Sequence, residues 1–203
     1  TGDFKVDYTP VFGDAIDLQR FAEIGKKGVL ALMSDSTNAE RPGFTQSERT
    51  VGATFDRLFA EHSNTRIIVA TFASNVDRVQ QIINTSYKYG RKVVVEGRSM
   101  VNIISVASEL GYLNVPENTL IETDQLKNYP REKTTIITTG SQGESMAALS
   151  RMAADIHKKI SIMPGDTIIL SSNPIPGNEK AVSNIINELS EKGANVIFQD
   201  THV

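Results

Sequence analysis

The sequence predicts an α/β fold, a three-layer sandwich built on a mainly parallel, Rossmann-like sheet. Two observations predict it. Short runs of β-branched and other apolar residues alternate with segments in which apolar residues recur at the 3.6-residue period of a helix. The runs are continuous, as in Ile67-Ile68-Val69, which is typical of strands covered on both faces. Repeated strand-then-helix order requires right-handed crossovers, so helices should cover both faces of the sheet.

Seven segments are expected to form strands because each is short, apolar and bounded by turn residues. They are 28–34, 66–72, 92–96, 119–122, 134–139, 166–171 and 195–199. Three stripes of apolar residues predict helices between them. The stripes are Val76, Val79, Ile82 and Ile83; Met100, Ile103, Ile104 and Ala107; and Ala181, Val182, Ile185, Ile186 and Leu189.

Capping residues place the ends of two helices. Asn178 is a favoured N-cap residue in front of the third stripe, and Gly193 is a typical stop signal after it. Thr45 and Glu48 have the spacing of a capping box, which predicts a further helix that reaches Phe59. The chain contains no internal repeat or linker, so residues 1–203 are expected to form one domain.

Composition narrows the class of protein. The 203 residues are 39% hydrophobic and 22% charged, which is typical of a globular protein with a sizeable core. No apolar segment is long enough to span a membrane, and cysteine is absent, so a reducing cytoplasm is the expected location. The net charge of −3 argues against a broad basic surface for nucleic acid. Any contact with RNA is therefore expected at a defined site.

The two ends are expected to mark an excised piece of a longer polypeptide. The chain opens at Thr1-Gly2-Asp3-Phe4-Lys5, which has the character of a strand and lacks an initiator methionine. It stops at Asp200-Thr201-His202-Val203, directly after an expected strand.

Four loops that follow expected strands are rich in hydroxyl and amide side chains and contain no Lys or Arg. They are Ser34-Asp35-Ser36-Thr37-Asn38, Thr71-Phe72-Ala73-Ser74-Asn75, Thr139-Gly140-Ser141-Gln142-Gly143-Glu144 and Ser171-Ser172-Asn173-Pro174. In open α/β sheets, ligands bind just beyond the carboxyl ends of the strands. Backbone N–H groups and hydroxyls in such loops bind anions, so a phosphate is the expected ligand.

Each loop also has a purely structural explanation. Ser141 with Glu144, and Ser74 with Asp77, have capping-box spacing, so these serines could serve only to close helix starts. Four loops of this composition at one sheet edge favour binding, because capping does not require such a concentration. The segment 140–143 lacks the Lys of a P-loop and the third Gly of a dinucleotide fingerprint, which excludes both motifs.

Asp35 and two histidines are the candidate titratable residues. Asp35 either orients a neighbouring histidine or caps the following turn, and the residues alone favour the turn. His157 is expected near the end of a helix over 147–156, where it suits the helix dipole. His202 follows a strand and is a functional candidate. There is no His-x-His, no His-Glu-x-x-His and no cysteine, so a complete zinc site cannot be built from this chain.

Several motifs, in order along the chain, resemble those of the ribonuclease J family. Gly2-Asp3-Phe4-Lys5 resembles the aspartate motif that ends the first stretch of its metallo-β-lactamase domain, and Ser34-Asp35-Ser36-Thr37-Asn38 resembles the acidic first motif of its β-CASP insert. The segments 70–75, 138–144 and 172–178 are similar to further signatures of the family. His202-Val203 resembles the first two residues of its H-V-S-G-H segment.

The resemblance implies a two-domain ribonuclease that cleaves RNA with two metal ions, usually zinc. A metal-activated hydroxide would attack the phosphodiester. Such an enzyme acts as a 5′-3′ exonuclease and an endonuclease in RNA maturation and decay, including rRNA processing. Residues 1–203 would be its β-CASP domain, with residues 1–5 the tail of the preceding metallo-β-lactamase domain.

The same resemblance assigns roles to individual residues. Asp3 would be a metal ligand, and Asp35 would be the acid that orients a catalytic histidine. Phe72-Ala73-Ser74 would line the RNA channel. His202-Val203 would begin the pocket for a terminal 5′-monophosphate.

Departures from the family pattern limit what this chain could do alone. The histidine-rich zinc motif and the S-G-H residues are not in the sequence, which leaves Asp3 as the single metal ligand. The chain alone is therefore expected to bind metal poorly and to cleave nothing. The expected partners are RNA with a 5′-monophosphate, the metallo-β-lactamase domain and a homo- or hetero-oligomer of the parent. Two alternatives stay open: a sugar-phosphate-binding α/β module and a non-catalytic Rossmann-like interaction domain.

Overall fold

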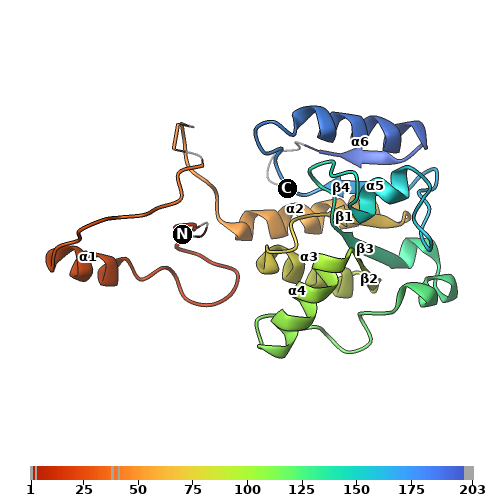
Figure 1. The fold of residues 1–203 in the computed structure, drawn as a ribbon. Coiled ribbons are helices and arrows are strands. Elements are labelled where there is room, and N and C mark those ends of the chain that lie inside the picture. The colour runs from red at the N-terminus through yellow and green to blue at the C-terminus, as the bar shows by residue number, and fades with distance from the viewer. Residues whose placement is uncertain (1, 3, 38, 41, 199–203) are drawn as a thin grey trace. The chain divides into compact units, whose positions relative to one another are not determined.

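The computed structural model describes residues 2, 4–37, 39–40 and 42–198. It divides the chain into two compact units, Thr1–Thr50 and Val51–Val203. Figure 1 shows the elements of both units. Each unit is described by itself below.

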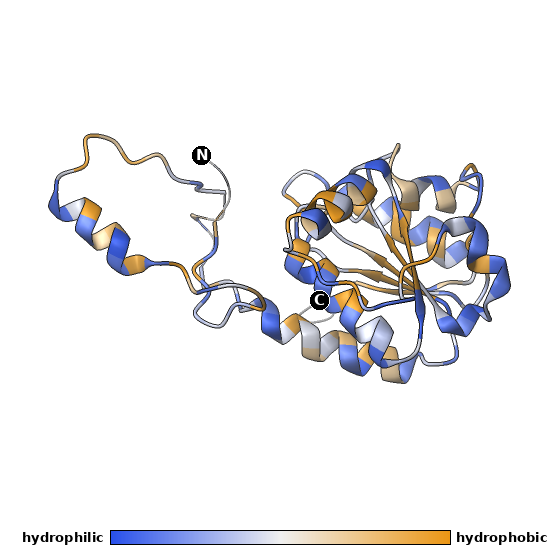
Figure 2. Cartoon of the chain, turned by 90° about the horizontal axis from the view of Figure 1, so that it is seen from below, coloured by the Kyte–Doolittle hydropathy of each residue, from blue (hydrophilic) through white to orange (hydrophobic). Residues whose placement is uncertain are grey.

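The first unit contains α1 (Leu18–Lys26) and the start of α2 (Glu48–Glu61). The sequence patterns did not predict α1, which begins where the Asp17 carboxylate accepts a hydrogen bond of 2.9 Å from the Arg20 backbone N–H. None of its residues is buried, and Figure 2 shows hydrophobic and hydrophilic residues interleaved along it.

Two predictions for the first unit were wrong. The segment 28–34 forms no strand in the part of the chain that the structure describes, and its apolar side chains are exposed. An apolar run becomes a strand only where a neighbouring strand pairs its backbone groups. The predicted Thr45 capping box is replaced by other acceptors: the Glu48 N–H donates to the Asp7 carboxylate at 3.2 Å, and the Arg49 N–H donates to Ser47 Oγ at 3.3 Å.

The second unit is built on a five-stranded sheet in the order β2-β3-β1-β4-β5, with every pair parallel. The strands are β1 (Ile67–Ala70), β2 (Lys92–Glu96), β3 (Thr134–Thr138), β4 (Thr167–Leu170) and β5 (Asn195–Ile197). They confirm five of the seven predicted strands. The segment 119–122 contributes only a single bridge, between Leu120 and Val93, so the prediction of a strand there was wrong.

Helices cover both faces of this sheet, which confirms the predicted three-layer sandwich. The remaining helices are α3 (Val76–Lys88), α4 (Arg98–Glu109), α5 (Ala148–Ala153) and α6 (Glu179–Glu191), with short 3₁₀ turns η1 (Thr123–Asn128) and η2 (Arg131–Lys133). All three predicted apolar stripes lie on observed helices, and Asn178 occupies the predicted N-cap position of α6.

Alternate residues of each strand enter two separate cores, as the period-two geometry of a strand requires. Ile67 and Val69 pack with α2, α3 and α4, whereas Ile68 and Ala70 pack with α5 and α6. Figure 2 shows the hydrophobic strands running between helices whose hydrophilic residues face outward. The continuous apolar character of the strands follows from this double burial.

Buried charged side chains at the amino edge of the sheet are hydrogen-bonded within the protein. Asp166 is fully buried; its carboxylate accepts hydrogen bonds from Arg66, from Arg131 Nη2 at 2.6 Å and from the Met163 backbone N–H at 2.8 Å. Arg91 donates to the carbonyl oxygens of three residues at the same edge, namely His62, Thr65 and Thr134. Burial lowers the pKa of Arg91 to about 10, so it remains charged at neutral pH.

Removal of the Asp166 carboxylate should destabilise the fold more than removal of an exposed carboxylate. We expect Asp166→Ala to lower the free energy of unfolding by about 3 kcal/mol, because Arg66 is left buried without its counter-charge. The control Glu61→Ala breaks the exposed Arg57–Glu61 pair and should cost below about 0.5 kcal/mol. Urea unfolding followed by circular dichroism measures both. Equal losses would contradict the assigned role of Asp166.

Candidate nucleic-acid interface

The order of the strands creates a crevice between β1 and β3 at the carboxyl edge of the sheet. These two strands are neighbours, but the chain leaves β1 for α3 on one face and leaves β3 for α5 on the other. The connecting loops therefore diverge. In open α/β sheets this divergence marks the place where ligands bind.

Three of the four polar loops lie together at this edge, as predicted. The loops 71–75, 139–144 and 171–174 follow β1, β3 and β4, which are adjacent parallel strands. The fourth loop, 34–38, belongs to the first unit and follows no strand among the described residues. The prediction that all four loops share one sheet edge was therefore wrong for 34–38, because its expected strand did not form.

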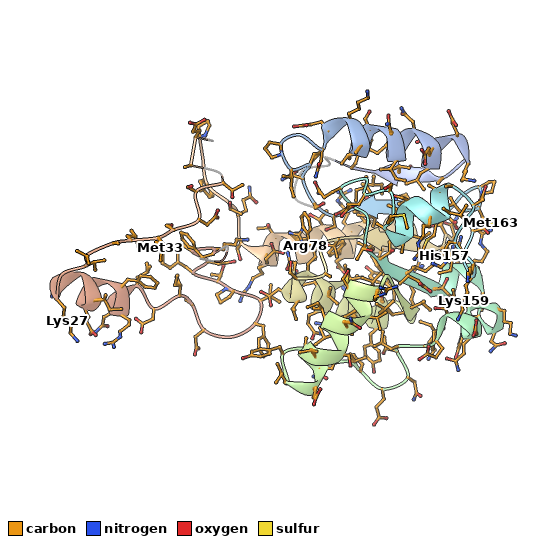
Figure 3. The ribbon with its side chains drawn as sticks, viewed as in Figure 1. Lys27, Met33, Arg78, His157, Lys159 and Met163 are labelled. Atoms are coloured by element: carbon orange, nitrogen blue, oxygen red, sulfur yellow. The ribbon has the colours of Figure 1, made fainter. Side chains whose placement is uncertain are left out.

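Hydrogen bonds join the loops that follow β1 and β4. The Ser171 carbonyl oxygen accepts from Arg78 Nη1 at 2.7 Å and from Thr71 Oγ1 at 3.3 Å. Arg78 lies in the first turn of α3 (Figure 3). Asn75, rather than the predicted Ser74, caps this helix, since its side chain accepts from the Arg78 backbone N–H at 3.0 Å.

Gln142 joins the loops that follow β3 and β4. Its side-chain amide is almost fully buried and donates to Ser172 Oγ at 3.0 Å and to the Asn173 carbonyl at 3.1 Å. Its carbonyl oxygen accepts from the Ile175 N–H at 2.8 Å. The capping box predicted for Ser141 and Glu144 was wrong, because α5 begins only at Ala148. Gln142 of this loop instead holds the loops after β3 and β4 together at the carboxyl edge of the sheet.

A cavity of about 710 Å³ lies among the segments that follow β1, β2 and β3. It is lined by Thr71, Phe72, Ala73, Gly97, Arg98, Ser99, Thr139, Gly140, Glu144, Met146, Ala147, Ala148 and Arg151. Phe72 and Ala73, two of the residues predicted to contact substrate, are therefore part of it. Ser74 is exposed beside them and is not a lining residue.

The positive charge of the cavity comes from helices and not from the loops. Arg98 is the first residue of α4 and is exposed. Because Gly97, Arg98 and Ser99 line the cavity, the amino end of this helix faces it. Arg151 lies on α5, and its Nε is buried without a hydrogen-bond partner. Sequence reasoning missed both arginines. For Arg98 the signal was the segment Gly97-Arg98-Ser99, which directly follows a correctly predicted strand.

Asp35 has a local structural role in the first unit. Its carboxylate accepts hydrogen bonds from Thr37 Oγ1 at 2.7 Å and from the Thr37 N–H at 3.0 Å, and these bonds hold the pKa of Asp35 below its usual value. This is the turn that the residues alone favoured. The catalytic role that the family resemblance gives Asp35 stays a prediction.

The other predicted site residues lie outside the described part of the chain. These are Asp3, His202 and Val203. Within residues 2, 4–37, 39–40 and 42–198, no three His, Cys, Asp or Glu side chains come together as a metal-binding group. The donor set that the structure describes does not fit a zinc centre.

His157 was predicted to lie near the end of a helix, and the structure places it elsewhere. The helix α5 stops at Ala153, and the His157 side chain is buried against Glu96, with 3.3 Å between Nε2 and Oε2. Periodicity alone could not reveal this, because the partner is 61 positions away in the sequence (157 − 96).

Comparison with known proteins identifies the family. The model of the family "Ribonuclease J, beta-CASP domain" matches residues 64–189, more than half of the chain. The chain belongs to the ribonuclease J β-CASP family. This confirms both the predicted resemblance and the predicted fold class.

Relatives of the family align with almost the entire chain. It is 52% identical to ribonuclease J 1 of Streptococcus pyogenes over 197 residues, which cover 97% of this chain and 35% of that protein. It is 47% identical to ribonuclease J of Thermus thermophilus and 45% identical to ribonuclease J2 of Bacillus subtilis; these alignments cover all of this chain and 35% and 36% of the relatives. The chain thus spans about a third of the length of the relatives it matches. None of the helices within the described residues is long and apolar enough to cross a membrane.

Substitution of Gly143 should disturb the packing of the loop after β3 against α6. Gly143 has a φ of +71°, and a Cβ there would lie 2.4 Å from the Ala181 carbonyl oxygen. The control Gly90 has a φ of +65° but open space around it. We expect Gly90→Ala to cost about 1 kcal/mol of unfolding free energy for its φ alone, and Gly143→Ala at least about 2 kcal/mol more. Urea unfolding measures the difference, and equal costs would contradict the close approach of this loop to α6.

Proposed function

We propose that this chain is the RNA-gripping β-CASP part of a longer metal-dependent ribonuclease. The observation that carries the proposal is the arginine-bearing cavity at the divergence of β1 and β3, in a domain of the ribonuclease J β-CASP family. The proteins matched over the whole chain bear the name ribonuclease J.

The chemistry of the cavity suits a single-stranded RNA segment. Arg98 and Arg151 supply positive charge for phosphate oxygens, to which guanidinium groups donate in a bidentate manner. Phe72 exposes 36% of its surface at the same cavity, and an exposed ring of this kind stacks against a base. Ser99 and Thr139 add hydroxyls within reach of sugar and phosphate. The charge is local, in keeping with the net charge of −3.

We assign recognition of the RNA end and RNA cleavage to residues that do not line this cavity and to the metallo-β-lactamase domain. His202 and Val203 begin the pocket for a 5′-monophosphate, which favours 5′-3′ exonuclease action alongside internal cuts in RNA maturation and decay. Asp3 contributes one ligand to a centre of two zinc ions, and Asp35 orients a catalytic histidine. The remaining ligands belong to the metallo-β-lactamase domain, so the chain alone cleaves nothing. The family resemblance supports these assignments.

The first unit supports the existence of a partner domain. Its large apolar side chains Leu30, Leu32, Met33 and Phe44 are all more than three-quarters exposed, and Figure 3 labels Met33 on this segment. A monomeric protein rarely exposes so many apolar side chains in one stretch. We propose that they pack on the metallo-β-lactamase domain of the cytoplasmic parent enzyme, which also forms a homo- or hetero-oligomer. The contact would then involve residues well beyond 1–5, the predicted tail of that domain.

The two cavity arginines should control RNA affinity. We expect Arg98→Ala and Arg151→Ala each to weaken binding of a 5′-monophosphorylated single-stranded RNA about tenfold, because each removes one charge-assisted contact with phosphate. The control Arg57→Ala removes an arginine of the exposed Arg57–Glu61 pair and should leave affinity unchanged. Fluorescence anisotropy at several salt concentrations measures affinity and the loss of salt dependence.

The same assay separates the alternative class of ligand. A sugar phosphate should compete with RNA only at far higher concentration, because it reaches one phosphate subsite and offers no base for stacking. Competition by sugar phosphate at the concentration of RNA itself would instead favour a sugar-phosphate-binding module. No binding of either compound would favour a pure interaction domain.

The proposed metal ligand can be tested in the longer parent protein. We expect Asp3→Ala to abolish metal-dependent RNA cleavage, because one carboxylate ligand of the metal centre is lost. The control Asp14→Ala alters a carboxylate of the same unit that has no proposed role. Cleavage of labelled RNA and the zinc content of the purified protein are the measurements. Full activity of the Asp3→Ala enzyme would contradict the assignment.

A further inference from the structure

A buried ion-pair geometry joins the last residue of β2 to the loop after α5. Nε2 of His157 lies 3.3 Å from Oε2 of Glu96, and the two side chains are only 6% and 15% exposed. Figure 3 labels His157 and its neighbour Lys159 in this loop. Neither His157 nor Glu96 lines the cavity.

Hydrogen bonds define the proton position on the His157 ring. Nδ1 accepts from the Ile160 backbone N–H at 3.1 Å and from the Lys159 backbone N–H at 3.4 Å. A ring nitrogen that accepts cannot carry the proton of the neutral ring. The proton of the neutral ring therefore lies on Nε2, the nitrogen that faces Oε2 of Glu96.

The second oxygen of Glu96 is also held. Oε1 accepts from Thr123 Oγ1 at 2.6 Å. Partners on two different elements thus fix the carboxylate, one in η1 and one in the loop after α5. A carboxylate with a partner at each oxygen is restricted in its rotation.

The contact between His157 and Glu96 links the two segments that neighbour the cavity arginines, Arg98 and Arg151. Glu96 stands two residues before Arg98, across a turn at Gly97 so tight that a Cβ would lie 2.6 Å from Thr139 Oγ1. On the other side, the His157 backbone N–H donates to the Arg151 carbonyl oxygen at 3.0 Å. His157 therefore contacts the end of the strand that leads into Arg98, and its backbone is hydrogen-bonded to that of Arg151.

We propose that His157 and Glu96 are positioning residues that hold Arg98 and Arg151 at a fixed separation, so that both guanidinium groups engage neighbouring phosphates of one RNA strand. The inference rests on the proposed RNA-binding function of the cavity. It adds two residues that act through the arginines and do not touch the RNA.

Two substitutions of His157 separate its two bonds. His157→Asn keeps an acceptor near the position of Nδ1 but loses the ring nitrogen that faces Glu96, whereas His157→Gln places an amide N–H near the position of Nε2, facing Glu96 again. We expect His157→Asn to weaken RNA binding about tenfold and His157→Gln to retain most of the affinity. Glu96→Ala should resemble His157→Asn. The control Lys159→Ala breaks the neighbouring exposed pair with Asp124 and should have no effect.

A double-mutant cycle tests whether His157 acts through the arginines. In a chain that already carries Arg98→Ala and Arg151→Ala, His157→Asn should weaken the residual RNA affinity less than about twofold. An equal fold-loss in both backgrounds, or a loss that follows the melting temperature of each variant, would show that His157 is merely structural and would overturn the proposal.

A measurement without RNA keeps the two proposals distinguishable. In ¹⁵N NMR spectra of the free chain, the Nε–Hε signals of Arg98 and Arg151 should broaden or shift in His157→Asn but not in Lys159→Ala. Unchanged signals would overturn the positioning role whether or not RNA binds. Altered signals in a chain that binds no RNA would preserve the positioning role and reject the proposed function.

Discussion

The parallel pairing of β1 with β3 is the constraint on which the candidate site depends. Because α3 and α5 leave these strands toward opposite faces, the two following loops must diverge, and the cavity occupies the space between them. The loops cannot collapse into this space. Hydrogen bonds of Gln142 and Arg78 hold these loops against the neighbouring loop that follows β4. Gly143 lets the loop after β3 approach the backbone of α6.

Arg66 and Arg91 at the amino edge of the sheet differ from Arg98 and Arg151 at the carboxyl edge in how their guanidinium groups are satisfied. At the amino edge, Arg66 and Arg91 are satisfied by a buried carboxylate and by backbone carbonyls, and their role is stability. At the carboxyl edge, Arg98 and Arg151 line a cavity, and Nε of Arg151 has no hydrogen-bond partner. A guanidinium left incompletely satisfied costs free energy unless a ligand completes it. This difference supports the proposed site at the carboxyl edge.

The two units differ in how far their apolar side chains are buried. The second unit buries its apolar side chains in two cores on either side of the sheet. The first unit leaves its apolar side chains exposed along α1 and the following segment, although the sequence pattern of 28–34 is that of a strand. Burial of those side chains would require contacts beyond the unit itself. The region that matches the family model, residues 64–189, lies within the second unit.

The sequence by itself determined the fold class, five strands, the main apolar helix stripes and the three polar loops that meet at one edge. These features depend on local periodicity and turn chemistry, which neighbouring residues encode. Only the tertiary structure decided that 28–34 stays unpaired, that Arg98 and Arg151 share a cavity, and that His157 faces Glu96. Each of these outcomes depends on which distant segments become neighbours. That is set by strand order and helix side, which no local pattern specifies.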